Sequence, residues 1–400
     1  MSHDVVVIGG GPAGAVAAIG LARQGRRVAL VERAPFPRRK VCGEYLSATS
    51  LPVLEAIGLG QAFLERAGPG VRRVGIFAGE RVALAPMPAA AGVYGRALGR
   101  DVLDTLLLNA ARRDGVEVFQ PATARRLGAE DGAHAVEIAA GGQVRTLCAP
   151  ALVAAHGSWE PGPLSTQLPR RHSAGDLLGF KAYFRAADVP ADLMTLLTFP
   201  GGYGGIVWAD RERLSLSCCI RRSMLEEVRA SHGGAAGEAV GAHLIGAMGG
   251  LRRALAGAER EGGWLAAGPI RPGIRPAYAD DIFRVGNLAG ESHPIIAEGI
   301  SMAIQSGWLL AGALAGVELS AMHERQRAGS RYGAAWRRQF ALRLRAAAAF
   351  AALFSRPAVA LTLAAAAGRF PLLLSTGARV SGKARPVSAM SPPQERLGAG

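Results

Sequence analysis

The first thirty residues alternate apolar runs with small-residue turns, a pattern typical of a strand–helix–strand unit. Residues 4–8 form an apolar run, as expected of a strand that is buried on both faces of a parallel sheet. A glycine-rich turn at 9–14 follows, an alanine-rich helical stretch extends to Gln24, and a second apolar run covers 27–31. The pattern predicts two parallel strands joined by a tight turn and a helix, with Glu32 at the end of the second strand.

The turn has the spacing G-x-G-x-x-G, with Gly9, Gly11 and Gly14 at the glycine positions. The first glycine would make the tight turn, the second would let the backbone approach a pyrophosphate, and the third would allow close helix packing. The helix N-terminus would offer N–H donors to an anion, and Glu32 would accept from ribose hydroxyls. The sequence therefore predicts a dinucleotide site, with a purely structural glycine turn as the alternative. The motif alone does not distinguish FAD from NAD.

The rest of the chain predicts an α/β body that is interrupted by a β-rich segment. The body elements are a helix over 100–113, a small antiparallel sheet over 123–139 and 143–147, strands over 151–155 and 281–286, and a helix over 298–314. Between about 159 and 270, strands alternate with loops. We expect a discontinuous cofactor domain over 1–158 and 271–320, a substrate domain over 159–270, C-terminal helices over 321–374 and a disordered tail over 375–400.

Charge is distributed unevenly along the chain. The protein has 46 Lys and Arg against 31 Asp and Glu, a net charge of +15, which taken alone favours nucleic acid or a membrane surface as partner. Residues 321–400 hold twelve arginines and Lys383 against Glu324 and Glu395, a net charge of +11 that leaves +4 for the first 320 residues. Because the excess lies in the C-terminal part, we expect no nucleic-acid partner.

The four cysteines, Cys42, Cys148, Cys218 and Cys219, include no C-x-x-C pair. No disulfide framework or metal site is therefore expected. The N-terminal residues lack the basic and small-residue pattern of a signal peptide, so we expect a cytoplasmic protein.

Five motifs in order resemble those of FAD-dependent oxidoreductases of the p-hydroxybenzoate hydroxylase superfamily, and most of all its geranylgeranyl reductase-like branch. They are the glycine motif, Glu32-Arg33, Lys40-x-Cys42-Gly43-Glu44, Arg100-x-x-Leu103-Asp104-x-x-Leu107, and a segment with Gly286-Asn287, Pro294 and Glu298-Gly299-Ile300. The resemblance covers residues 4 to about 315. It implies an α/β fold: a Rossmann-like FAD-binding domain with an inserted β-rich substrate domain and a C-terminal helical appendage.

The resemblance also implies which residues hold the FAD. They are Gly9, Gly11, Pro12, Ala13, Gly14, Glu32, Arg33, Cys42, Gly43, Arg100, Ala124, Gly286, Asn287, Gly299 and Ile300. Two positions depart from the family pattern, because Asn287 and His156 stand where the family usually has aspartate. NAD(P)H is a possible electron donor, but the absence of these aspartates argues against direct reduction of the flavin by it.

Two residues are candidates for proton transfer. Cys42 matches a cysteine that lies against the flavin ring in the reductase branch, and simple packing is its alternative role. His293, beside Pro294, would lie over the flavin, and a structural role is its alternative. Glu44 and Tyr45 follow Cys42 and could form an acid pair at the ring or only cap the surface.

The glycine-rich segment 199–205 loosely resembles a turn of the reductase branch that faces the substrate. Phe199, Tyr203 and Trp208 are therefore the expected substrate contacts, with a plain hairpin as the alternative. The expected function is reduction of a carbon–carbon double bond in an apolar polyketide- or isoprenoid-like substrate by hydride from flavin. The alternatives are an FAD-dependent monooxygenase, which hydroxylates through a flavin hydroperoxide, and a non-catalytic flavin-binding or membrane-associated protein.

The C-terminal part combines an aromatic stripe with arginines. Tyr332, Trp336, Phe340 and Leu344 recur every four residues, and apolar segments follow over 346–367. Core packing is the favoured interpretation. The alternative is that 321–374 contacts a membrane or a carrier protein, which would place the protein at the inner membrane face.

Overall fold

The computed structural model of the chain describes residues 3–90, 92–130, 132–159, 161–169 and 172–379. Its first sheet has six strands in the order β18–β19–β11–β1–β2–β7, parallel except for the β18–β19 pair. The strands are β1 (Val5–Ile8), β2 (Val28–Val31), β7 (Glu117–Phe119), β11 (Ala151–Ala154), β18 (Tyr278–Ala279) and β19 (Ile282–Arg284). The central strands are fully buried, which explains their continuous apolar sequence.

Helices cover one face of this sheet and a small sheet covers the other. The helices are α1 (Pro12–Ala22), α2 (Leu51–Ala56), α3 (Gly60–Arg66), α4 (Arg100–Arg113) and α8 (Gly299–Ala313). The small antiparallel sheet consists of β8 (Ala122–Glu130), β9 (Ala133–Ala140) and β10 (Gln143–Ala149). The expected α/β fold is confirmed, including the helices at 100–113 and 298–314.

The second sheet has seven strands in the order β16–β12–β15–β14–β13–β4–β5. They are β4 (Arg73–Ala78), β5 (Arg81–Pro86), β12 (Leu177–Arg185), β13 (Leu193–Phe199), β14 (Gly202–Trp208), β15 (Leu214–Arg221) and β16 (Glu259–Ile270). Two differences from the sequence prediction stand out. β4 and β5 come from the expected cofactor domain, and three helices, α5 (Arg222–His232), α6 (Ala236–Ala247) and α7 (Gly249–Ala254), cover one face of the sheet.

Two short strand pairs join the layers. β3 (Tyr45–Leu46) pairs with β6 (Arg96–Ala97), and β17 (Gly273–Ile274) pairs with β20 (Gly290–Glu291).

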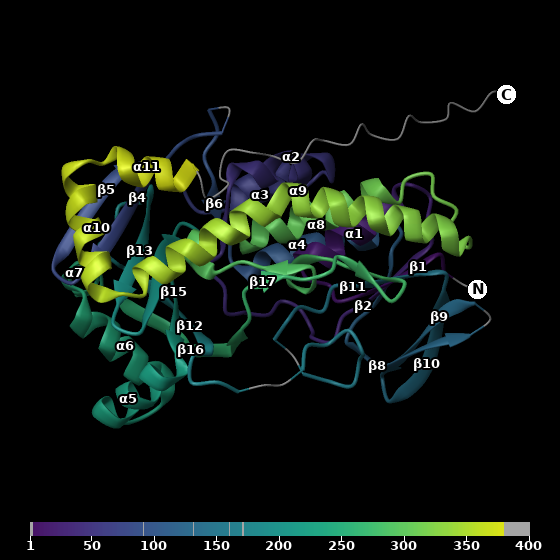
Figure 1. Cartoon of the computed structure of the whole chain (residues 1–400), viewed down its shortest axis with the longest axis horizontal. Helices are drawn as coiled ribbons and strands as arrows, with labels where there is room; N and C mark the ends of the chain where they lie inside the picture. The colour runs from purple at the N-terminus through teal and green to yellow at the C-terminus, as the bar shows by residue number, and fades with distance from the viewer. Residues whose placement is uncertain (1–2, 91, 131, 160, 170–171, 380–400) are drawn as a thin grey trace.

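Three helices complete the chain: α9 (Met322–Phe354), α10 (Pro357–Arg369) and α11 (Leu372–Ala378). Figure 1 shows α9 crossing from the first sheet to the second, where α10 and α11 fold over β4 and β5. The predicted disordered tail from residue 375 is wrong at its start, because α11 continues to Ala378; residues 380–400 lie outside the described part of the chain. Within that part no single helix is long and apolar enough to cross a membrane. One pair of helices, Met322–Phe354 and Ala358–Arg369, reaches that length and composition together but is bent by 105°.

The aromatic stripe of α9 packs into the core, as its spacing favoured. Tyr332, Trp336 and Phe340 are buried in the same cluster as α1 and α8. The Tyr332 hydroxyl donates to the carbonyl oxygen of Arg284 over 2.9 Å. The first half of α9 is therefore an integral part of the first domain.

Candidate functional site

One continuous cavity of about 540 Å³ runs between the two sheets. One end is lined by the glycine turn after β1 and by Glu32, and the middle by the loop 40–45. The far end is lined by β13 and β14 of the second sheet and by α9, α10 and α11. The residues of one cavity thus come from both sheets and from the C-terminal helices.

The glycine turn leaves no room for side chains at two of its positions. Gly9 has a φ of +111°, and a Cβ there would lie 2.5 Å from the Ala155 carbonyl oxygen. A Cβ on Gly14 would lie 2.0 Å from the Gly9 carbonyl oxygen. At Gly11 the nearest atom to a Cβ would be an Arg100 nitrogen at 3.8 Å, so this position leaves space on the cavity side. The turn therefore has the shape that brings backbone amides close to a diphosphate.

Two helices begin at this cavity. Within the described part of the chain, no side chain caps α1 at Gly11 or α8 at Glu298. Pro12, Ala13, Gly299 and Ile300, the first residues of these helices, line the wall. The N-terminal amide groups and the partial positive charge of both helices are thus available for the anionic parts of a ligand.

Glu32 closes the nucleotide end of the cavity. Its carboxylate accepts the backbone N–H of Gly10 and of Ala34, each over 2.8 Å, and is buried. Arg33 points to solvent and is not part of the cavity wall, where Arg38 lies instead, 3.6 Å from Glu32. Ala124 lies on β8, whose first residue, Ala122, donates to the Glu32 carbonyl oxygen.

The loop after Lys40 forms the middle of the cavity. Cys42 and Gly43 both line it, and Cys42 Sγ accepts the Glu44 amide N–H over 3.4 Å. Arg100, at the start of α4, lines the same region and forms a bidentate pair with Asp104 over 2.6 and 2.7 Å. Burial acts to lower the pKa of Arg100, but Asp104 raises it overall, so the guanidinium stays charged.

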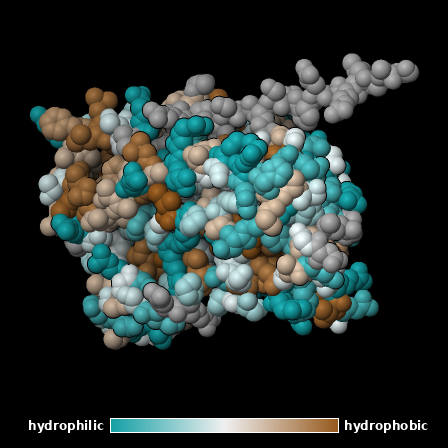
Figure 2. Space-filling view, turned by 45° about the vertical axis from the view of Figure 1, so that its right-hand side comes forward, coloured by the Kyte–Doolittle hydropathy of each residue, from teal (hydrophilic) through white to brown (hydrophobic). Residues whose placement is uncertain are grey.

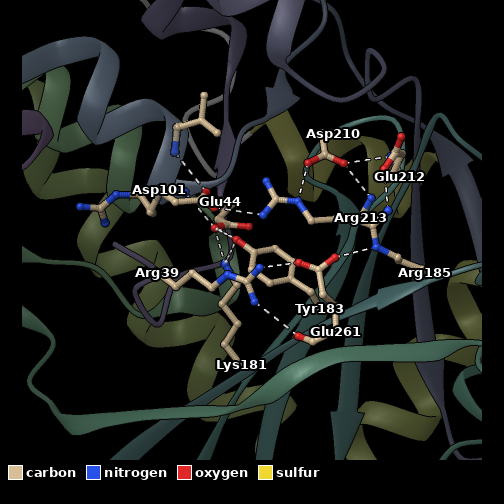
Figure 3. Close-up of polar contacts among 12 residues, drawn as sticks. Arg39, Glu44, Asp101, Lys181, Tyr183, Arg185, Asp210, Glu212, Arg213 and Glu261 are labelled. Carbon is tan, nitrogen blue, oxygen red and sulfur yellow. Dashed lines mark hydrogen bonds and ion pairs between the residues drawn. The ribbon is translucent and has the colours of Figure 1, made fainter. Parts of the chain in front are cut away.

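A buried ion pair holds this loop against the second sheet (Figure 3). Lys181 on β12, completely buried, contacts Glu44 Oε1 and donates to the Tyr183 hydroxyl over 2.9 Å. The Tyr183 hydroxyl and the Arg100 amide both donate to the same Glu44 oxygen. The other oxygen, Oε2, has no hydrogen-bond partner among the residues that the structure describes, although Glu44 lines the cavity. Burial lowers the pKa of Lys181 against the opposing effect of Glu44, and burial together with Glu44 raises the pKa of Tyr183.

Sequence reasoning missed Lys181 and Tyr183, and placed Glu44 only as half of an acid pair with Tyr45. Lys181 lies in the middle of the mostly apolar strand β12, and a lysine buried in such a strand requires a partner. That pattern could have identified it. Tyr45 does line the cavity, but its buried side chain lies near Glu298 rather than joining Glu44.

A third buried carboxylate, Glu291, also lines the cavity. It accepts from Ser158 and from the Trp159 indole over 2.7 Å each, and from the Asn287 amide over 3.1 Å. Burial raises its pKa, although the hydrogen bonds from Trp159 and Ser158 oppose the rise. Gly286 and Asn287 line the cavity at the carboxyl end of β19, as predicted, and Glu291 orients the Asn287 side chain.

His293 is one hydrogen bond away from the cavity. Its Nδ1 lies 3.2 Å from the hydroxyl of Tyr203, and Tyr203 lines the wall. Burial lowers the pKa of His293, and burial together with nearby Cys219 and Glu291 raises that of Tyr203. At neutral pH the pair therefore consists of a neutral imidazole and a protonated phenol.

The expectation that Phe199 and Trp208 contact the substrate is wrong. Both pack on the other face of the second sheet, in the core against α5, α6 and α7. The Trp208 indole donates to the Val189 carbonyl oxygen over 3.1 Å, and Phe199 meets the His243 ring edge-on. Neighbouring positions of a strand point to opposite faces, which the loose motif match did not resolve.

The wall at the far end is apolar and comes largely from the C-terminal helices. It includes Phe350, Leu353, Phe354, Leu363, Ala367, Leu373, Leu374 and Ala378. The predicted appendage is thus part of the site. No group of three or more His, Cys, Asp or Glu side chains that could hold a metal occurs among the described residues.

Comparison with known proteins bears on the cofactor. A family model described as an FAD binding domain matches residues 2–220, more than half of the chain. The chain belongs to this FAD-binding family. The uncapped helix ends, the tight glycine turn and Glu32 fit FAD, and the predicted cofactor and superfamily are confirmed.

Among similar proteins, a menaquinone reductase of Mycobacterium tuberculosis is 32% identical over 170 residues, which cover 42% of this chain and 41% of the reductase. The match thus spans less than half of that relative. The myxobacterial chondrochloren halogenase has a TM-score of 0.72 at 22% identity, covering 84% of this chain and 80% of the halogenase. A geranylgeranyl bacteriochlorophyll reductase-like protein of Thermoplasma acidophilum has a TM-score of 0.66 at 18% identity, covering 94% and 99%. The two structures establish the fold only.

Proposed function

We propose that the protein is an FAD-dependent oxidoreductase that reduces a carbon–carbon double bond in an apolar, polyketide- or isoprenoid-like substrate. The observation that carries this proposal is the continuous cavity, polar where FAD fits and apolar where α9, α10 and α11 close it. A long apolar molecule with its reacting part in the middle suits such a cavity. The partial match to a menaquinone reductase is compatible with reduction.

Reduction of such a bond adds a hydride to one carbon and a proton to the other. Reduced FAD supplies the hydride when it is bound. The starts of α1 and α8 would hold the anionic parts of the cofactor, and the loop 40–45 and Asn287, which line the same cavity, would orient it. The apolar wall excludes water from the reacting carbons.

The proton comes from Tyr203 in this proposal. Tyr203 lines the cavity and its hydroxyl stays protonated at neutral pH. The neutral imidazole of His293 is bonded to this hydroxyl and would relay the replacing proton, giving one at Nδ1 while it takes one up at Nε2. Cys42 also lines the cavity and is the second candidate donor. A Tyr203→Phe variant is expected to lose about 10²-fold or more in turnover while binding FAD normally. Cys42→Ser is the matched comparison, and full activity of Tyr203→Phe with loss in Cys42→Ser would assign the proton to the thiol.

One experiment tests the reaction itself. The FAD-loaded protein is reduced without air by dithionite, NADH or NADPH and given menaquinone as a first isoprenoid probe. The expected product gains two hydrogen atoms by mass spectrometry. In D₂O both are deuterium with dithionite as reductant, because it supplies only electrons, and at least one is deuterium with NADH or NADPH. A product that contains an added oxygen atom, formed only in air, would establish the monooxygenase alternative. Bound FAD that no donor reduces would point to a non-catalytic flavin-binding protein.

A further inference from the structure

The far end of the cavity opens among exposed apolar side chains. Leu353 on α9 and Leu373 on α11 both line the cavity, and both are also exposed, by 44% and 55%. Beside them on the outside, Phe370 is 62% and Leu372 is 77% exposed. Figure 2 shows apolar side chains gathered at the end of the molecule where α10 and α11 lie. The apolar wall of the cavity therefore continues onto the surface.

Exposed positive charge accompanies this surface. Residues 345–379 contain four arginines, Arg345, Arg356, Arg369 and Arg379, and no aspartate or glutamate. All four arginines are exposed. An apolar cluster with cations and no anions matches the acyl region of a bilayer and its anionic headgroups, and both kinds of contact strengthen binding.

We infer that α10, α11 and the end of α9 dock on an anionic phospholipid membrane and form the entrance through which the substrate passes from the lipid into the cavity. The entrance part rests on the proposed function, because it requires a lipid-soluble substrate. The docking part rests on the surface alone. A membrane is favoured over a second copy of the chain because an isologous interface would set these four arginines against each other with no acidic residue on the same segment.

Vesicle flotation tests the docking without any assay of turnover. The full-length FAD-loaded protein is mixed with vesicles of phosphatidylcholine alone, or with about a quarter phosphatidylglycerol. Binding is expected to be strongest with the anionic lipid and to weaken with salt. The variant Phe370→Asp/Leu372→Asp changes two residues that do not line the cavity, and it should bind anionic vesicles at least about tenfold more weakly.

The matched control is Val144→Asp/Met322→Asp, two residues that are 57% and 55% exposed. Val144 lies on β10 and Met322 in the first turn of α9, at the opposite end of the molecule from α11 (Figure 1). This control should float like the wild type. Wild-type protein that binds neither vesicle, or a Phe370→Asp/Leu372→Asp variant that binds as well as the control, would overturn the proposal.

A spectroscopic variant locates the contact. In Phe370→Trp, the new indole should shift its emission to the blue on anionic vesicles and be quenched by brominated lipid, since it enters the acyl boundary. An unchanged emission would overturn the assignment of the surface. A dimer that Phe370→Asp/Leu372→Asp dissociates would assign it to a second copy, and saturable binding of a purified acyl carrier protein without vesicle binding would assign it to a carrier.

Because binding and turnover are measured separately, the two proposals fail separately. Normal reduction of a detergent-dispersed substrate together with no vesicle binding removes the docking and the entrance, and leaves the proposed reaction in place. Normal vesicle binding with no reduction removes the proposed reaction and the entrance, and leaves the docking in place.

Discussion

The two ends of the cavity are built in opposite ways. The nucleotide end comes mainly from one local unit, β1, the glycine turn, α1 and Glu32, and two of its glycines have no room for a Cβ. The far end is assembled from segments that lie far apart in the sequence, from β4 at Val74 to α11 at Ala378. The first end is therefore fixed by backbone geometry and the second by side-chain size, so the same body can keep its cofactor while its substrate changes.

The largest effect should come from a single methyl group at the nucleotide end. In Gly14→Ala, the new Cβ would lie 2.0 Å from the Gly9 carbonyl oxygen and 2.9 Å from Ala155 Cβ. The backbone of the turn would have to move to relieve the first contact. We expect loss of FAD binding and a fall of about 4 kcal/mol or more in the free energy of unfolding. Flavin absorbance after gel filtration and urea unfolding measure the two.

Gly128→Ala is the control, because a Cβ on Gly128 meets nothing within 4 Å. It should change stability by less than about 1 kcal/mol. A Gly14→Ala protein that retains FAD would show that the turn tolerates more than its geometry suggests.

The same difference decides what the sequence could predict. Local spacing predicts the glycine turn, Glu32 and the helix starts at Gly11 and Gly299. A tight turn requires glycine at fixed positions, and these positions lie close together in the sequence. The partners of Glu44 were not predictable from spacing, because Lys181 lies 137 positions away and is brought near only by the second sheet.

The far wall of the cavity was missed for a related reason. The apolar pattern of residues 346–374 predicts helices correctly, but their amphipathic faces are equally compatible with a core, a membrane or a cavity. Only the packing of α10 over β4 and β5 places Leu363 in the cavity wall. The predictions for Phe199 and Trp208 failed for the same reason. Successive side chains of a strand point to opposite faces of the sheet, and the sequence does not show which face lines the cavity.

The ion pair that joins the two regions should give the next largest effect. Lys181→Met leaves the Glu44 carboxylate buried without its cation, and we expect it to cost about 3 kcal/mol in the free energy of unfolding. The double variant Lys181→Met/Glu44→Gln removes the unpaired charge and should recover part of that loss. Urea unfolding of the three proteins measures the coupling.

Arg185 on the same strand supplies the control, because it pairs with Glu212 and Glu261 at the surface over 2.5 and 2.7 Å. Arg185→Met should cost less than about 1 kcal/mol. Equal costs for Lys181→Met and Arg185→Met would mean that the buried pair does not link the regions.

A change of size at the far end should affect substrate and not cofactor. Leu363→Trp fills part of the wall formed by α10, and we expect KM to rise about tenfold with an unchanged dissociation constant for FAD. Leu361→Trp, two residues earlier and outside the cavity wall, is the matched control. A parallel loss of FAD affinity in Leu363→Trp would contradict the separation of the two ends.

The smallest effect concerns how α9 is attached to the first domain. Arg325, buried near the start of α9, donates to Asp281 Oδ2 over 2.7 Å and to the Leu319 carbonyl oxygen over 2.6 Å. Burial acts to raise the pKa of Asp281, but Arg325 and the Tyr278 hydroxyl lower it below its ordinary value of 3.8. A carboxyl whose pKa is lower in the folded state stabilises the fold above its unfolded value, and this contribution is lost as pH falls through the folded pKa.

The stability difference between wild type and Asp281→Asn should therefore be constant above about pH 5 and shrink as pH falls below 3.8. Because Asp281 is partly solvated, we expect the pH-dependent part to stay below about 1 kcal/mol. Thermal unfolding of both proteins at several pH values measures it, and the difference cancels the titration of the other carboxylates. Protonation of Asp281 should loosen α9 and, with it, the far wall of the cavity. Because FAD fits at the other end, the pH profile of FAD binding should be the same in wild type and in Asp281→Asn. A difference that persists unchanged to pH 3 would show that Asp281 anchors α9 without its charge.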